Sequence, residues 1–200
     1  MQLGGDTRMH EFLQSTAVID CDTASVIAFA SQLAGGANDE EVVARQCFVW
    51  VRDCVRHSSD HRISVVTCRA SEVLEHRAGF CYAKSHLLAA LLRANRIPAA
   101  LCYQRLALDD EGSAFCLHGL VSIFLQRHGW YRVDPRGNKA GLTADFCPPV
   151  ERLAFTPRLP GEADVSGLFS DALPSVVSAL TRWPTADEVA MNLPDFEPAA

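Results

Sequence analysis

The chain has 200 residues, of which 48% are hydrophobic and 21% are charged, with a net charge of −6 and a pI near 5.6. This length suits one domain with a full hydrophobic core, so we expect residues 1–200 to form a single domain. The acidic balance, with lysine only at Lys84 and Lys139, argues against a nucleic-acid partner.

The expected location follows from what the sequence lacks. No apolar run approaches the ~20 residues that a membrane helix needs, so we expect no membrane partner. Residues 1–6 lack the basic segment and apolar core of a secretory signal. We therefore expect a cytoplasmic protein whose eight cysteines stay reduced, and none of them has the Cys-x-x-Cys spacing of common zinc and redox sites.

Apolar periodicity in the first part of the chain predicts helices. The first covers about 25–33 and is stopped by a Gly-Gly pair, and the second covers about 40–56. Residues 57–69 lack helical periodicity and are predicted to form a loop. A short helix then begins at Ser71 and ends near Gly79.

The rest of the chain predicts one more strong helix followed by strands. A leucine-rich stripe predicts a buried central helix from Cys81 to about Asn95. Strand-forming residues then predict three strands and a hairpin loop with glycine at its end, and one later helix. These segments are 99–108, 117–125, 130–133, the loop Arg127–Gly129 and the helix Ser175–Arg182. The pattern indicates an α+β fold with the cysteine helix on an antiparallel sheet, a core of about 40–140, and an irregular C-terminal wrap over 141–200.

Cys81 lies where a chain can place a nucleophile. Gly79 precedes it by two residues, and Cys81 itself falls in the first turn of the predicted helix. The free backbone N–H groups of a helix start carry partial positive charge, which favours a thiolate. A cysteine nucleophile also needs a base and a group that orients the base.

His118 and Asp134 are the candidates for these two roles. His118 begins one predicted strand and Asp134 ends the next, so the hairpin makes them neighbours. A loop at Arg127–Gly129 predicts that Asp134 lies opposite Ser122, on the face of His118 but about 13 Å along the strand. A bulge or strong curl would have to close this gap.

These three segments together resemble the transglutaminase-like superfamily, and most closely the small bacterial transglutaminase-like domain proteins. The resemblance covers roughly residues 40–140 and rests on the segments Gly79-Phe80-Cys81-Tyr82-Ala83-Lys84-Ser85, His118 and Trp130-Tyr131-Arg132-Val133-Asp134-Pro135. It implies a papain-like core with a catalytic triad of Cys81, His118 and Asp134. It also implies acyl transfer through a cysteine thioester, on a peptide, a protein or a small amide.

The resemblance suggests further details of the site. Hydrolysis is somewhat favoured over amine transfer, and neither a metal nor another cofactor is expected. The backbone N–H of Cys81 is a candidate oxyanion donor, and a second donor is expected upstream, where Asp60, His61 and Ser64 lie. The chain departs from the family in having Gly119 after the histidine, near where many members have an aromatic residue.

Three alternatives remain open from the sequence. Cys47, Cys54, His57 and His61 would share a helix face and suggest zinc, although their spacing matches no ordinary zinc site. The protein could be a non-catalytic interaction module that keeps the fold, which predicts no acyl-enzyme. It could also be an acyltransferase that uses a thioester donor, which predicts a need for a coenzyme or carrier protein.

Overall fold

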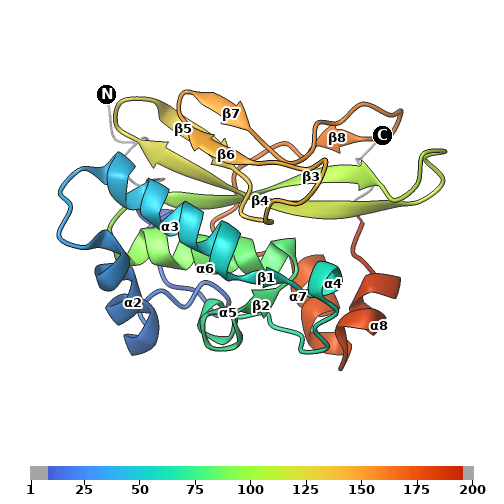
Figure 1. Cartoon of the computed structure of the whole chain (residues 1–200), viewed down its shortest axis with the longest axis horizontal. Coiled ribbons are helices and arrows are strands. Elements are labelled where there is room, and N and C mark those ends of the chain that lie inside the picture. The colour runs from blue at the N-terminus through green and yellow to red at the C-terminus, as the bar shows by residue number, and fades with distance from the viewer. Residues whose placement is uncertain (1–8, 196–200) are drawn as a thin grey trace.

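The computed structural model describes residues 9–195, in which helices are followed by an antiparallel sheet (Figure 1). The helices are α2 (Ala24–Ala34), α3 (Glu40–Cys54), α4 (Ser58–His61), α5 (Ala70–His76), α6 (Cys81–Ala94), α7 (Pro174–Arg182) and α8 (Ala186–Met191). The strands are β1 (Arg56–His57), β2 (Ala78–Gly79), β3 (Ala99–Ala107), β4 (Phe115–Leu125), β5 (Gly129–Val133), β6 (Asp145–Cys147), β7 (Val150–Arg152) and β8 (Ala163–Asp164).

Local sequence explains where the first helices begin and end. The Asp39 side chain caps α3 by accepting a hydrogen bond from the Glu41 backbone N–H at 2.9 Å. The carboxylates of the first turn also suit the positive end of the helix. Gly35 ends α2 in the left-handed conformation, with φ 56°. The helices predicted over 25–33 and 40–56 are confirmed to within two residues at each end.

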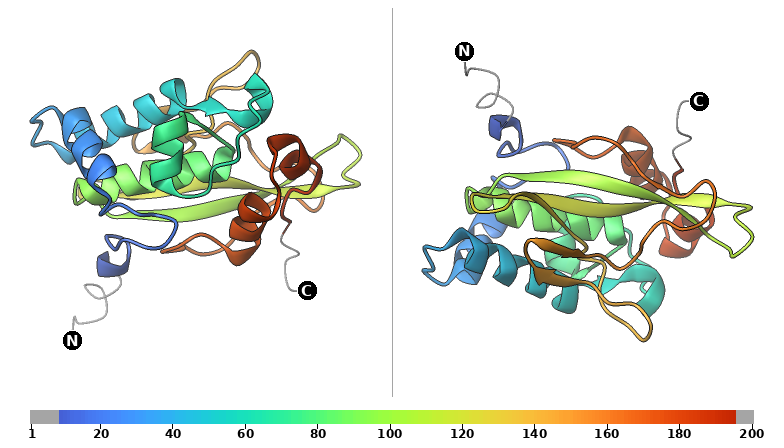
Figure 2. Two further views of the ribbon diagram at one scale, coloured as in Figure 1. Left: turned by 90° about the horizontal axis from the view of Figure 1, so that it is seen from below. Right: turned by 90° about the horizontal axis from the view of Figure 1, so that it is seen from above.

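Helix α6 is the centre of the molecule. It packs against β3 and β4 on one side and against α2, α3 and α5 on the others (Figures 1 and 2). Every residue from 81 to 93 is buried, because the helix is covered on all sides. The position of Cys81 at its start is therefore fixed by the packing of the whole helix.

The main sheet has the strand order β5-β4-β3-β8, with antiparallel neighbours throughout. β3 pairs along its full length with β4, from Ala99 opposite Ile123 to Ala107 opposite Phe115. The predicted α+β class, with the cysteine helix packed on an antiparallel sheet, is confirmed.

The hairpin between β4 and β5 differs in register from the predicted one. Leu125 pairs with Gly129 and Val121 with Val133, so the loop is 126–128. Gly129 has φ 73° and still supplies the positive φ that the turn needs. If the observed register is extended by one residue, Asp134 lies opposite Leu120 and not opposite Ser122. The predicted separation from His118 was wrong by two residues, because the loop begins one residue earlier than predicted.

The region before α5 is only partly the predicted loop. β1 pairs in parallel with β2, which places His57 opposite Gly79, and α4 follows over residues 58–61. A two-residue strand and a four-residue helix are too short to show periodicity, so the sequence pattern did not reveal them. Their effect is to bring His57 close to the start of α6.

The C-terminal region contains more regular structure than the sequence indicated. α7 matches the helix predicted over 175–182, but α8 was not predicted, so the expectation of one late helix was wrong. Thr185 caps α8 by accepting from the Glu188 backbone N–H at 3.3 Å. Six residues are too few to establish a helical pattern. The two helices lie side by side at one end of the molecule (Figures 1 and 2).

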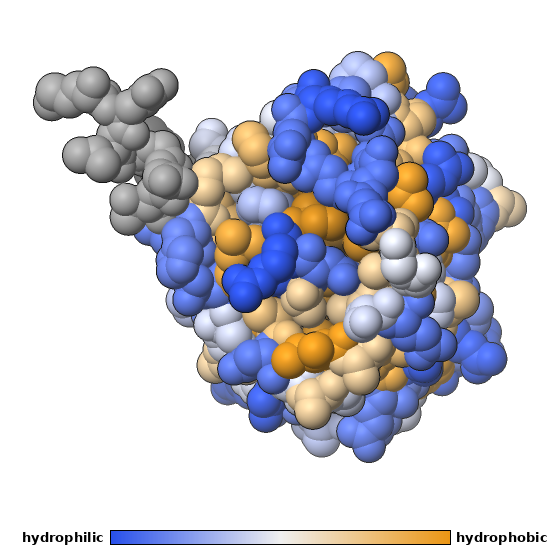
Figure 3. All heavy atoms as spheres, turned by 90° about the vertical axis from the view of Figure 1, so that its left-hand side faces the viewer, coloured by the Kyte–Doolittle hydropathy of each residue, from blue (hydrophilic) through white to orange (hydrophobic). Residues whose placement is uncertain are grey.

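At the α2 end of the molecule, hydrophilic side chains break up the hydrophobic areas (Figure 3). Within residues 9–195, no helix is both long enough and apolar enough to cross a membrane.

Candidate active site

Cys81 is the first residue of α6, and close packing holds it there. Phe80 is the N-cap residue, with an extended backbone. A Cβ added at Gly79 would lie 2.9 Å from Ala83 Cβ and 3.0 Å from Thr67 Oγ1, so only glycine fits without displacement. Cys81 is 7% exposed, with its thiol at the helix start where unpaired N–H groups favour negative charge.

The structure brings His118 and Asp134 into direct contact. His118 Nε2 lies 2.7 Å from Asp134 Oδ2, and both side chains are buried. The observed register explains the contact, because a separation of two residues along twisted strands is within reach of the two side chains. Neither the bulge nor the strong curl is needed to close the gap.

Hydrogen bonds fix the Asp134 carboxylate in turn. Its Oδ1 accepts from the Arg136 backbone N–H at 3.0 Å and its Oδ2 from the Ala154 backbone N–H at 3.2 Å. Burial alone would raise the pKa of Asp134, but His118 and these two N–H groups hold the pKa below its ordinary value. Asp134 is therefore an anion whose position is set from three sides.

Electrostatics also set the state of His118. Burial alone would lower the pKa of His118, but the neighbouring Asp134 and Cys81 raise it to about 10. The Cys81 thiol is close enough to the ring to contribute to this rise, and both side chains line the same cleft. A protonated imidazole next to a cysteine is the arrangement that general acid catalysis at a thiol nucleophile requires.

The residue after His118 explains how the sheet approaches the helix so closely. A Cβ at Gly119 would lie 3.0 Å from Tyr82 Cα and 3.2 Å from Tyr82 N. The Gly119 backbone N–H points at Cys81 Sγ at 3.5 Å, and the Tyr82 hydroxyl donates to the Leu117 carbonyl. The departure from the aromatic pattern thus has a physical reason, since Tyr82 of the helix fills this space.

A cleft of about 290 Å³ opens at Cys81 and His118. Its wall is mostly apolar and comes from β3, β4 and the C-terminal region, with the side chains of Leu106, Leu108, Leu117, Phe155 and Leu193 among the lining. Phe155 packs edge-on against the His118 ring, with centroids 4.9 Å apart. Phe155 was not predicted from the sequence, because nothing in an irregular segment indicates its contact.

His57 also lines this cleft and was not among the upstream candidates. Its ring packs edge-on against Phe80, and its Nδ1 is buried without a hydrogen-bond partner in the described residues. Burial, followed by the charge of Arg136, lowers the pKa of His57 to about 3, so the ring is neutral. The sequence feature that could have indicated His57 is its position directly after the end of the apolar face of α3.

The three residues expected upstream lie elsewhere. Asp60 pairs with Arg136 at 2.7 Å and with Lys139 at 2.8 Å, and it does not line the cleft. His61 and Ser64 are exposed and do not line the cleft either.

The zinc alternative finds no support in the described part of the chain. Helix α3 ends at Cys54, so the four residues do not continue along one helix face. Cys47 and His57 are buried, whereas Cys54 and His61 are exposed. Within residues 9–195, no group of three or more His, Cys, Asp or Glu side chains could hold a metal ion.

Several solved structures resemble this fold, including the following two. The "putative cysteine protease" from Cytophaga hutchinsonii has a TM-score of 0.52 and 23% identity, over 68% of this chain and 43% of that one. The periplasmic domain of TgpA from Pseudomonas aeruginosa, bound to ethylmercury, has a TM-score of 0.50 and 18% identity, over 65% of this chain and 49% of that one. The match thus spans less than half of either structure, and at these identities it shows the fold alone.

Sequence comparison places the chain in a family. Among curated proteins there is no significant match. A sequence model of the transglutaminase-like superfamily matches residues 27–135, which include Cys81, His118 and Asp134. The matched range is more than half of the chain and spans α6 and the β4–β5 hairpin. The chain belongs to the transglutaminase-like superfamily.

Proposed function

We propose that this protein is a cysteine hydrolase that cleaves an amide or peptide bond through a thioester on Cys81. The observation that carries the proposal is the His118 ring, which lies 2.7 Å from Asp134 and lines the same cleft as the Cys81 thiol. An apolar cleft next to the thiol suits an apolar acyl group.

The contacts support a two-step reaction. The Cys81 thiolate attacks the carbonyl carbon, forming a C–S bond while the carbonyl π electrons move to oxygen. As the oxyanion collapses, the C–N bond breaks and His118 gives its proton to the departing amine. Neutral His118 then takes a proton from water as the water oxygen attacks the thioester, and the thiolate leaves with an acid as product. Asp134 holds the imidazole and stabilises its positive form.

In this reaction, the oxyanion receives hydrogen bonds from the Cys81 backbone N–H and from His57. The first donor is a free amide at a helix start. The second is a neutral ring that lines the same cleft. Water is the preferred acceptor, although an amine in its place would give transamidation with the same residues.

Alkylation with iodoacetamide at about pH 6 tests the activated thiol. Cys81 should react faster than the other seven cysteines, because His118 remains protonated at that pH. Mass spectrometry of peptides gives the rate at each cysteine, and exposed Cys54 is the internal control for an ordinary thiol. Asp134→Asn should slow the labelling of Cys81 and leave that of Cys54 unchanged. The proposal fails if Cys81 labels no faster than Cys54.

The role of His57 can be separated from that of the thiol. His57→Phe should lower the rate of acyl-enzyme formation from an activated ester by about 10²-fold to 10³-fold, because one oxyanion donor is lost. His57→Gln keeps an N–H donor and should recover part of this loss. Alkylation of Cys81 forms no oxyanion, so its rate should be the same in both variants. Equal loss of both reactions in His57→Phe would show that His57 only supports the fold.

A further inference from the structure

A second cavity, of about 320 Å³, lies on the other side of His57 and Arg136, which line both it and the cleft. It is formed by α3, β1, α4, α6 and the segment after β5. Its lining contains three arginines, one lysine and two carboxylates, so its positive charges outnumber the negative ones. The hydrolysis proposed above uses His57 of this lining but not its lysine.

Lys84 is the deepest charge in this cavity. The residue is fully buried, with 0% exposure, and its Nζ donates to the Arg52 carbonyl at 3.2 Å and to the Val55 carbonyl. An ammonium group has three N–H donors, so these two hydrogen bonds leave one N–H without an acceptor. No carboxylate of the described residues lies within ion-pair distance of Nζ.

Gly137 lies next to the Lys84 ammonium group and has no side chain that could cover it. A Cβ at this position would lie 3.4 Å from Lys84 Nζ and 3.2 Å from the Arg52 carbonyl oxygen. Gly137 also has φ 110°, a conformation that side chains disfavour. A side chain at this position would therefore crowd Nζ and strain the backbone, and glycine does neither.

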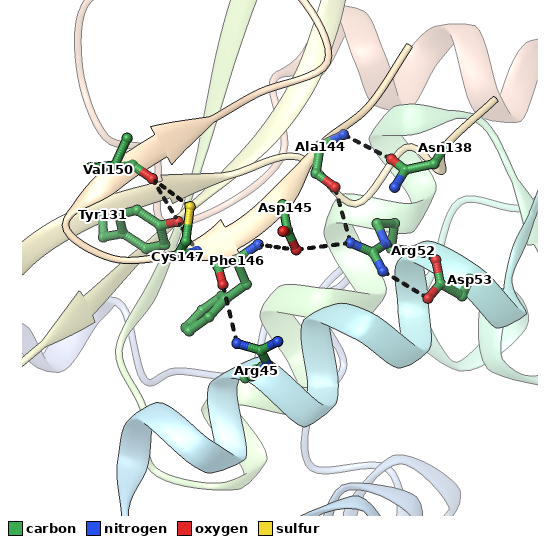
Figure 4. A network of polar contacts seen from close by, with 10 residues as sticks. All are labelled: Arg45, Arg52, Asp53, Tyr131, Asn138, Ala144, Asp145, Phe146, Cys147 and Val150. Carbon is green, nitrogen blue, oxygen red and sulfur yellow. Dashed lines mark hydrogen bonds and ion pairs between the residues drawn. The ribbon is translucent and has the colours of Figure 1, made fainter. Parts of the chain in front are cut away.

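The nearby carboxylates are already engaged with other cations. Asp60 forms ion pairs with Arg136 at 2.7 Å and with Lys139 at 2.8 Å. Arg52 is held by Asp53 and Asp145 and by the Ala144 carbonyl, as Figure 4 shows. Two basic side chains of the lining form no ion pair within the described residues. They are Lys84, in the interior, and Arg56, which is exposed at the rim.

We propose that this cavity is a binding site for a small oxyanion, a carboxylate or a phosphate, with Lys84 as its central ligand and Arg56 at its rim. A buried ammonium without a counter-ion is costly, and an oxyanion supplies both the missing charge and an acceptor for the remaining N–H. Lysine binds phosphate and carboxylate as a point charge, so no bidentate geometry is required. The site does not depend on the hydrolysis proposed above.

The protonation of Lys84 provides a direct readout. Burial lowers the pKa of Lys84 to about 7, and Asp134, Arg136, Asp53 and Asp60 are the charged groups that act on it. A bound anion favours the charged form and should raise the pKa by about one unit or more. Affinity for the anion should fall as pH rises above 7, because the ammonium loses its proton.

The chain has only two lysines, so selective labelling of lysine side chains with ¹⁵N and ¹³C gives one signal from Lys84 and one from Lys139. Inorganic phosphate is titrated at constant ionic strength, with chloride as the control anion. The Lys84 signal should shift and its pKa should rise, with little change at Lys139, which lies outside the cavity lining. A shift no larger for Lys84 than for Lys139 overturns the proposal, because it indicates non-specific binding.

Variants test the same site without relying on one substitution. Lys84→Met should abolish the phosphate dependence of the melting temperature. Arg56→Gln, at an exposed position, should weaken phosphate binding about tenfold without impairing folding. Arg152→Gln, also exposed but outside the cavity, is the matched control and should bind as the wild type does. Wild-type affinity in both Lys84→Met and Arg56→Gln contradicts the proposal.

A last comparison identifies the source of the oxyanion. Cys81→Ala protein, which cannot turn over substrate, is titrated with an N-acetylated dipeptide acid and with the corresponding amide. A Lys84 shift with the acid alone indicates a carboxylate carried by the substrate. A shift with phosphate but with neither dipeptide indicates a free anion. No shift with any of the three removes the site, whether or not the protein is a hydrolase.

Discussion

Gly119 shows how a single missing side chain shapes the candidate active site. Tyr82 of α6 occupies the space that a Cβ at this position would need, and this contact sets the distance between β4 and the start of α6. His118 and Cys81 lie on the two sides of this contact. Their spacing therefore depends on Gly119, although Gly119 contributes no side chain to the chemistry.

Gly119→Ala should lower both the rate of Cys81 acylation and the stability of the fold. The added methyl pushes on the Tyr82 backbone, which we expect to cost about 1–3 kcal/mol of unfolding free energy. A misplacement near 1 Å between nucleophile and base should cost about 10²-fold in rate.

Ile123→Val in the same strand is the control for stability alone. It should cost about 0.5–1.5 kcal/mol with near-normal acylation, because its side chain lies in the core away from the cleft. Urea unfolding and burst kinetics with an activated ester measure the two effects. Normal acylation in Gly119→Ala would show that the spacing tolerates the shift.

At the level of elements, the sequence predicted the central features well. The helix from Cys81 follows from strong periodicity and the strands β3 and β4 from runs of strand-forming residues, and all three appear at nearly the predicted bounds. The proximity of His118 to Asp134 was expected, but its register was not, because a loop shift of one residue changes the pairing without altering composition.

Other parts of the site could not be predicted, for a different reason. His57 reaches the cleft through a two-residue parallel strand, and Phe155 through an irregular segment. Both contacts are long-range and are set by how elements pack, whereas periodicity reports only local structure. The buried surroundings of Lys84 likewise depend on the end of α3, which lies far away in the sequence.

The last turn of α6 connects the start of β3 with two distant segments through Arg93. This buried side chain donates to the Ala99 carbonyl from Nε and Nη2, to Gln14 from Nη1 at 2.7 Å, and to Ser170 from Nη2 at 2.8 Å. Arg93→Met should lower the free energy of unfolding by about 3–5 kcal/mol, because it leaves buried carbonyls without donors.

Urea denaturation measures this loss, with Arg96→Met as the control. Arg96 follows the same helix but is exposed, so its substitution should change stability by less than about 0.5 kcal/mol. Equal effects of the two substitutions would mean that the Arg93 hydrogen bonds add nothing to stability.

For the whole molecule, two buried groups near Asp134 titrate in opposite senses. The pKa of His118 is raised from 6.5 to about 10, against the effect of burial, by Asp134 and Cys81. The pKa of Lys84 is lowered from 10.5 to about 7 by burial. The raised pKa of His118 gives stability that is complete below pH 6.5 and is lost as pH rises toward 10. The lowered pKa of Lys84 means that the unfolded chain binds more protons between pH 7 and 10.5, so this group makes stability rise with pH.

These opposing slopes predict that the wild-type protein changes little in stability between about pH 7 and about pH 8.5, whereas each variant reveals one slope. In His118→Gln only the lysine slope remains, so the free energy of unfolding should rise by about 1.5 kcal/mol across this range. In Lys84→Met only the histidine slope remains, and the free energy should fall by about 2 kcal/mol. Urea unfolding at several pH values gives these slopes directly, and the slope is unaffected by any constant loss that the substitution itself causes. Parallel curves for the wild type and both variants would show that neither group titrates differently in the folded and unfolded states.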